Sequence, residues 1–244
     1  MRQGDVMRRN RRAGPLVQVR AAFTGFRFAP EVILPAVRWY LRYGLSFRDL
    51  EEILAERGID VDRVSLFRWV QRFTPLLIDS ARPCRHAVGD RWFVDGTFVR
   101  VSGIWRYAYR AFDEHGRVVY VFVSEHRGIA SARAFGATSA LARRIATEVI
   151  ADRGAALANV TPDLIPAAFH DAGQCESNRC EAGHGRLKAR LRPVRGIKTD
   201  RAASVVIRGR AFVQNVRRGH HELGVEASPV LRLAAAFDEL QPAI

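Results

Sequence analysis

The sequence has little cysteine, almost no lysine and no long apolar stretch. Its 244 residues include 3 cysteines, at positions 84, 175 and 180, which are too few and too scattered for a disulfide framework. There is no run of about 18 apolar residues, so no membrane-spanning helix is expected. The basic first residues also lack the hydrophobic segment of a secretory signal. These absences together favour a cytoplasmic globular protein with no membrane partner.

Positive charge dominates what is present, and arginine carries nearly all of it. The chain has 39 basic against 25 acidic residues, which gives a net charge of +14. The basic set contains two lysines, Lys188 and Lys198. Because the planar guanidinium group matches phosphate oxygens in a bidentate way, this excess favours a nucleic-acid partner. A GC-rich genome that encodes arginine in place of lysine explains the ratio of the two residues but not their excess over acids.

The first part of the sequence reads as a basic arm followed by helices. Residues 1–22 are expected to be flexible, because they show no apolar periodicity. A helical block follows from about residue 30 to 78, where Pro35 must either open or kink the first helix. Ser46 is the expected cap of the second helix, with the carboxylate of Asp49 three residues on.

A third helix is expected to start at a cap formed by Asp62 and to end at Thr74-Pro75. The turn before it, residues 58–61, is short and begins with a glycine. The apolar stripe of this helix leaves a polar outer face, formed by Arg63, Ser65, Arg68, Gln71 and Arg72. Such an arrangement predicts a helix-turn-helix unit whose second helix reads DNA. An ordinary three-helix bundle with a solvated basic face is the alternative.

The remainder predicts a mixed sheet with helices. Stretches rich in β-branched and aromatic residues alternate with turn residues, which is typical of antiparallel strands. A fourth, short strand follows an alanine-rich helix, and further helices come after it. The expected strands are 91–101, 105–112, 117–124 and 148–151, and the expected helices are 130–145, 178–191, 202–218 and 230–240.

Three carboxylates lie where a metal site can form. Asp95 is inside the first strand, where an unpaired buried carboxylate costs several kcal/mol. Asp152 closes the fourth strand, and Glu181 lies on a late helix with Lys188 two turns along the same face. Carboxylate oxygens are the ligands that Mg²⁺ prefers. Taken singly, each has a plainer interpretation: an arginine partner for Asp95, a turn for Asp152 and a solvated helix face for Glu181.

Four stretches of the sequence also carry a family resemblance. They are residues 23–73 with the segment AVRWYLRYGLSFRDLEE, residues 94–113 with a WxYxYRAxD pattern, residues 178–196 (NRCEAGHGRLKARLRPVRG) and residues 209–219. In these stretches the chain resembles a bacterial insertion-sequence transposase of the DDE superfamily, and it is most similar to the insertion-sequence six family.

The resemblance implies an α+β protein with four parts. A basic arm at 1–22 would precede an N-terminal helix-turn-helix bundle at 23–80. An RNase H-like mixed-sheet domain of the DDE type would cover 88–220, and a C-terminal tail would follow at 221–244.

The resemblance also implies roles for the carboxylates. Asp95, Asp152 and Glu181 align with the catalytic residues that hold two Mg²⁺ ions, for which Mn²⁺ can substitute. Lys188 aligns with a residue that grips the terminal phosphate. The implied function is a DNA transposase that binds the terminal inverted repeats of its element, cleaves the ends and joins the freed 3′-hydroxyl to target DNA. A homodimer is implied because two ends are paired.

Some positions depart from the family pattern. Asp95 is followed by Gly96 in place of the usual glutamate, and His184 is preceded by glycine in place of aspartate. The separation of Asp152 and Glu181, with 28 residues between them, is shorter than expected. Two alternatives therefore stay open: a catalytically decayed transposase copy, and a helix-turn-helix regulator without nuclease activity.

A zinc site is a further alternative. His170, Cys175, Cys180 and His184 have spacings compatible with zinc ligands. Cys180 and His184 would, however, share a helix with Glu181, and the resemblance accounts for the histidines but not for the cysteines. Magnesium at the carboxylates is therefore the preferred prediction.

Overall fold

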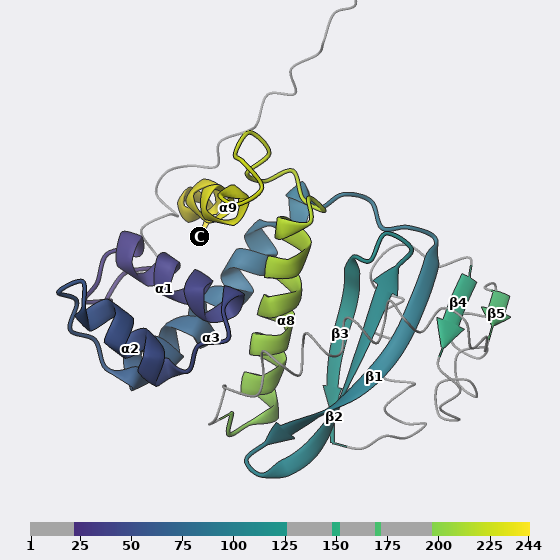
Figure 1. Ribbon diagram of the computed structural model, residues 1–244, viewed down its shortest axis with the longest axis horizontal. Helices are drawn as coiled ribbons and strands as arrows, with labels where there is room; N and C mark the ends of the chain where they lie inside the picture. The colour runs from purple at the N-terminus through teal and green to yellow at the C-terminus, as the bar shows by residue number, and fades with distance from the viewer. Residues whose placement is uncertain (1–21, 126–147, 152–168, 172–196) are drawn as a thin grey trace, which may run out of the picture.

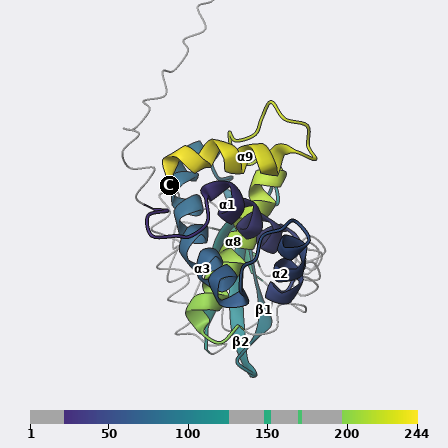
Figure 2. The same ribbon diagram turned by 90° about the vertical axis from the view of Figure 1, so that its left-hand side faces the viewer.

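The structure is a computed structural model that describes residues 22–125, 148–151, 169–171 and 197–244. One long helix, α8, stands between a group of helices and a sheet (Figure 1). Viewed from the helical side, α9 lies across the top of the group (Figure 2). The helices are α1 (Pro30–Arg42), α2 (Phe47–Ala55), α3 (Arg63–Ser80), α8 (Asp200–Arg217) and α9 (Arg232–Leu240), with short 3-10 turns at Arg82–Cys84 and Gln241–Ala243.

Within the described ranges, five strands form one sheet in the order β3-β2-β1-β4-β5. The first three strands are antiparallel neighbours, whereas β4 runs parallel to β1 and β5 runs parallel to β4. The mixed sheet predicted from the sequence is therefore confirmed. The strands are β1 (Arg91–Val101), β2 (Ile104–Asp113), β3 (Val118–Ser124), β4 (Glu148–Ala151) and β5 (Phe169–Asp171).

Both predicted helix caps are present. The Ser46 N–H donates to the Asp49 carboxylate at 2.8 Å, and the Asp49 N–H donates to the Ser46 hydroxyl at 3.2 Å, which completes a capping box. Asp62 accepts hydrogen bonds from the backbone N–H groups of Val64 and Ser65 at 2.8 and 2.9 Å. These bonds satisfy amides that a helix start would otherwise leave unpaired.

Two expectations about the third helix were wrong. The helix does not stop at Thr74-Pro75 but continues to Ser80. Proline removes one backbone hydrogen bond there, but Thr74 and Leu77 are fully buried, and packing holds the helix together. The connection from α2 to α3 is also longer than predicted, since it spans residues 56–62. Gly58 provides the turn within it, at φ +72°.

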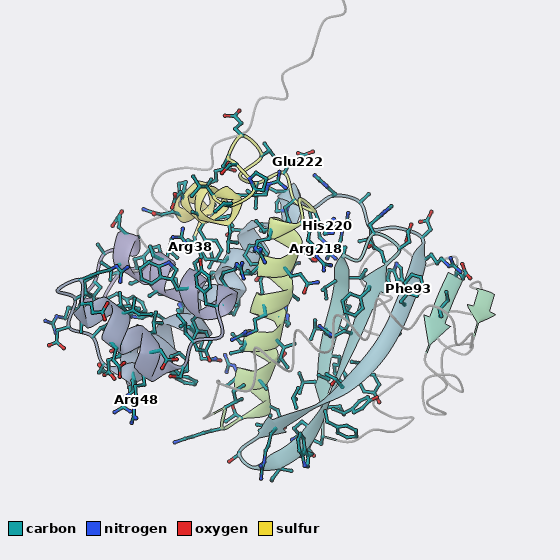
Figure 3. All side chains as sticks on the ribbon, viewed as in Figure 1. Arg38, Arg48, Phe93, Arg218, His220 and Glu222 are labelled. Carbon is teal, nitrogen blue, oxygen red and sulfur yellow. The ribbon has the colours of Figure 1, made fainter. Side chains whose placement is uncertain are left out.

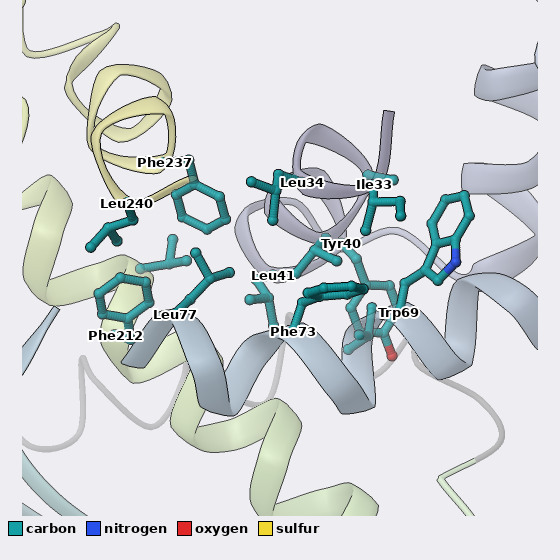
Figure 4. Close-up of a cluster of buried hydrophobic side chains, with 14 of the residues drawn as sticks. Ile33, Leu34, Tyr40, Leu41, Trp69, Phe73, Leu77, Phe212, Phe237 and Leu240 are labelled. Carbon is teal, nitrogen blue, oxygen red and sulfur yellow. The ribbon is translucent and has the colours of Figure 1, made fainter. Parts of the chain in front are cut away.

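The larger hydrophobic core joins α1, α2 and α3 to α8 and α9 (Figure 4). Gly209 of α8 makes this close packing possible. A Cβ atom there would lie 2.6 Å from Thr74 Cγ2 and 2.7 Å from Leu41 Cδ2. The helix expected at 230–240 is confirmed as α9, whose Phe237 is buried in the same core. Packing thus connects the segments 23–80 and 221–244, and the proposed division into domains stays a prediction.

A second core lies between α8 and one face of the sheet. It includes Phe93 and Val99 of β1 together with Ala203 and Ile207 of α8. At the sheet edge the Asn215 side chain accepts a hydrogen bond from the Val118 N–H at 2.9 Å and donates one to the Val118 carbonyl at 2.8 Å. A side chain of α8 therefore pairs with backbone groups of β3, an edge strand whose outer hydrogen-bonding groups have no neighbouring strand among the described residues.

The helices expected at 130–145 and 178–191 lie outside the described residues. None of the helices in the part that is described has the length and apolar character needed to span a bilayer.

Candidate functional site

Asp95 occupies the middle of β1, the central strand of the sheet. On one side it is opposite Arg110 of β2. On the other side, the preceding residue, Val94, pairs with Ala151, the last residue of β4. Asp152 is the next residue in the sequence, but it lies outside the described residues, as do Glu181 and Lys188. Their convergence with Asp95 therefore stays a prediction.

Arg110 is a candidate site residue that the sequence reasoning missed. Its side chain is buried, and its guanidinium carbon lies 4.8 Å from the centre of the Phe112 ring. A buried cation opposite Asp95 can balance the charge of a carboxylate on the neighbouring strand. The two-residue turn at Ser102-Gly103 fixes this register, so the pairing could have been derived from the hairpin signal.

The outer face of α3 largely follows the prediction. Arg63, Arg68 and Arg72 are exposed, whereas Ser65 and Gln71 are half-buried. Two of these predicted DNA-contacting residues are engaged within the protein. Arg63 Nε lies 3.1 Å from a carboxylate oxygen of Glu51, and the Ser65 hydroxyl donates to Asp62 at 2.8 Å. Arg68 and Arg72 are therefore the strongest candidates for contacts with phosphate.

The same face carries two apolar residues that were not predicted to be exposed. Val64 has 57% of its surface exposed and Phe67 has 36%. Periodicity assigns apolar residues to a core, so the sequence alone gave no reason to place them outside. Apolar side chains on a helix that enters the major groove can contact the methyl groups of thymine.

Arginine and histidine residues gather where α8 ends beside the sheet, where Figure 3 labels Arg218 and His220, and Arg117 and His221 among them are buried. Arg117 lies 3.6 Å from the fully buried Asp113 and donates to the carbonyl of His86 at 2.8 Å. Burial, followed by the charge of nearby arginines, lowers the pKa of both His220 and His221 to about 4. Both rings are thus neutral at pH 7, and the cluster joins the segment before β1 to the turn between β2 and β3.

No metal-binding group of three or more histidine, cysteine or acidic residues occurs within the ranges that the structure describes. Cys175, Cys180 and His184 lie outside those ranges, and only the backbone of His170, on β5, is described. The zinc alternative therefore stays a hypothesis.

Comparison with known proteins adds independent findings. Residues 89–220 match a family model described as a DDE domain. The chain is also 38% identical over 109 residues to the transposase for insertion sequence-like element IS431mec of Staphylococcus aureus. The same figures describe its similarity to the transposase for insertion sequence element IS257 in transposon Tn4003, also from Staphylococcus aureus. Each match covers 45% of this chain and 49% of the relative, so the chain spans about half the length of these curated relatives.

A solved structure with partial similarity is the simian T-cell lymphotropic virus intasome in complex with PP2A regulatory subunit B56 gamma. Its TM-score of 0.40 at 16% identity, over 61% of this chain and 56% of that one, is too low to support an argument. The family model, in contrast, covers more than half of the chain. The chain therefore belongs to the DDE-domain transposases, of the insertion-sequence six type that its sequence resembles.

Proposed function

We propose that this protein is a DNA transposase that binds the ends of its element, cleaves them and transfers the freed 3′-hydroxyl to target DNA. One observation carries the proposal. β1 and β4 are parallel neighbours, and the pair Val94–Ala151 directly precedes Asp95 and Asp152 in the sequence. An RNase H-like site with two aspartates on adjacent strands accounts for this register.

Asp95, Asp152 and Glu181 are the residues that would hold divalent metal ions in this site. Three carboxylates form a donor set of hard oxygens, which suits Mg²⁺ or Mn²⁺ better than zinc. Two such ions, when bound, supply Lewis-acid stabilisation to the oxygens of the phosphate. Arg110, which is opposite Asp95 in the register, would place a positive charge on the neighbouring strand, and Lys188 would bind the terminal phosphate of the DNA.

The three N-terminal helices would act as the helix-turn-helix unit of a homodimer. α3 would lie in the major groove of the terminal repeat, with Arg68 and Arg72 on phosphate and Val64 and Phe67 against base edges. The exposure of these four side chains supports this arrangement. Arg63 would have to leave Glu51 before it could contact DNA.

A strand-transfer assay with Mg²⁺ tests the catalytic proposal. Asp95→Asn and Glu181→Gln should each reduce cleavage of a terminal-repeat duplex by at least about a thousand-fold, because neither amide supplies a carboxylate for the metal. Binding of the same duplex should stay within about two-fold of wild type. Asp90→Asn, which changes an exposed aspartate just before β1, serves as the matched control. Cleavage at the wild-type rate by both site variants would refute the proposal.

One observation favours a second candidate, a DNA-binding protein without nuclease activity. Arg110 stands opposite Asp95 in the register, as it would if the pair were only structural. Under this alternative the wild-type chain binds terminal repeats but cleaves none with either Mg²⁺ or Mn²⁺. Asp95→Asn would then lower the stability of the fold without removing any activity.

A further inference from the structure

An unusual row of aromatic rings runs along one face of the β1–β2 hairpin. The rings of Tyr109, Tyr107, Phe98 and Trp105 meet edge to face, with centres 4.6, 5.0 and 6.4 Å apart in that order. Along the row the exposed fraction rises from 1% and 6% for the two tyrosines to 48% for Phe98 and 61% for Trp105. A row that begins in the interior thus ends on an open aromatic surface.

The row lies on the face of β1 that Gly96 and Phe98 share. Gly96 follows Asp95, and a Cβ atom on it would lie 2.2 Å from the Tyr107 ring, so this glycine allows the ring to lie against the strand. Phe98 is three residues beyond Asp95, or about 10 Å at roughly 3.3 Å per residue. Alternation along the strand therefore assigns Asp95 and the exposed rings to opposite faces of β1.

The surroundings of the exposed rings are positively charged. The Arg100 guanidinium lies 5.9 Å from the centre of the Trp105 ring and is held there by a hydrogen bond from its Nε to the Gly103 carbonyl at 3.1 Å. The hairpin tip is also bonded to the segment that precedes α8, because the Ser102 N–H donates a hydrogen bond to the Ile197 carbonyl at 2.8 Å. Lys198, which is exposed, directly follows Ile197 in the chain and so lies near the hairpin tip.

Two carboxylates lie nearby, and both are paired with a third cation, Arg106. Asp200 lies 2.8 Å from Arg106 Nε, and Glu125 lies 3.4 Å from the same guanidinium. Flat aromatic rings beside cations match a nucleotide, which offers a ring to stack on and a phosphate to bind. An apolar protein surface would match the rings but not Arg100 and Lys198.

We infer that Phe98 and Trp105 form a stacking surface for an unpaired base of the DNA that this protein binds, on the face of β1 opposite to that of Asp95. Arg100 and Lys198 bind the phosphates on either side of that base. The inference rests on the proposed function, because it requires a DNA end at this sheet, and it adds a site for a base that has left its duplex. Stacking of this kind tolerates any base, since each has an aromatic face.

Fluorescence anisotropy with two probes tests the inference on the full chain. One probe is a blunt duplex of about 20 base pairs, and the other is the same duplex with about five unpaired nucleotides, one of them 2-aminopurine. Wild type should bind the tailed probe about ten-fold more tightly and quench the 2-aminopurine. Trp105→Ala should lose both effects, whereas Trp105→Phe, which retains a ring, should keep most of them.

Ile104→Ala is the matched control, because Ile104 is 57% exposed and is the neighbour of Trp105 in the chain. It should behave like wild type with both probes. The inference fails if Trp105→Ala retains the full preference and quenching, or if that variant turns a dimer into a monomer, since the rings would then join two copies. A wild-type chain that binds neither probe would overturn the proposed function together with this inference.

Discussion

At the scale of single residues, Gly209 controls how closely three helices approach one another. In a helix interior, alanine is normally more stable than glycine by about 1 kcal/mol. We expect the opposite for Gly209→Ala, a loss of about 1 to 3 kcal/mol, because the added methyl group overlaps the side chains of Thr74 and Leu41. Urea denaturation measures the difference.

The cause of that loss can be isolated with a double mutant. Leu41→Ala removes one of the two overlapping side chains, so Gly209→Ala should cost less in its presence than in wild type. If the cost is the same in both backgrounds, contact with Leu41 is not its origin.

His221 predicts a pH dependence of stability. Its pKa is about 4 in the folded protein, against about 6.5 for an unperturbed histidine. Above pH 6.5 the ring is neutral in both states and contributes no pH dependence. Between about pH 6.5 and 4 the unfolded chain binds the proton first, so the free energy of unfolding should fall by up to about 1.4 kcal/mol per pH unit.

Chemical denaturation at pH 7 and at pH 5.5 checks this expectation. His221→Gln should reduce the loss of stability between the two pH values. Equal losses in wild type and His221→Gln would contradict the assignment.

At the scale of elements, α3 is expected to bind DNA through its exposed arginines. Arg72→Ala should weaken binding to all DNA sequences by a similar factor and lower the slope of log affinity against log salt by about one unit, because one phosphate contact is lost. Arg82→Ala provides the control, since this exposed arginine lies just beyond α3 and is paired with Asp79 at 2.6 Å. Filter binding at several salt concentrations measures the affinity and the salt slope of each variant. An unchanged slope for Arg72→Ala would remove α3 from the proposed interface.

The elements also show what the sequence could and could not predict. Strands β1 to β4 and the caps at Ser46 and Asp62 were predictable, because local alternation and side-chain hydrogen bonds determine them. The passage of α3 through Pro75 depends on packing with distant residues, and β5 is too short to show any periodicity. At the candidate site, Asp95 was located correctly on its strand, whereas its partner Arg110 required the register of the hairpin.

At the scale of the whole molecule, α9 belongs to the core shared by the N-terminal helices. Phe237 is 1% exposed, and its ring lies 6.1 Å from that of Phe212 on α8. Phe237→Ala should therefore destabilise the protein by about 3 to 5 kcal/mol. Val230→Ala, at a position that is 89% exposed, should change stability by less than about 0.5 kcal/mol.

Circular dichroism and tryptophan fluorescence should report the Phe237→Ala shift at the same denaturant concentration, because α8 contributes residues to both hydrophobic cores. Two separate transitions, of which only one moves, would instead indicate that the helical part and the sheet unfold independently.

Under the proposed function, the position of α8 has a consequence for where DNA would be cut. One side of this helix contacts α1 and α3, and the other contacts β3 and the rest of the sheet. The helix therefore separates α3, the proposed recognition helix, from the strand that carries Asp95. A terminal repeat held on α3 would then meet the scissile bond at a set number of base pairs from the recognised site, and inserting bases between the two would abolish cutting rather than move it.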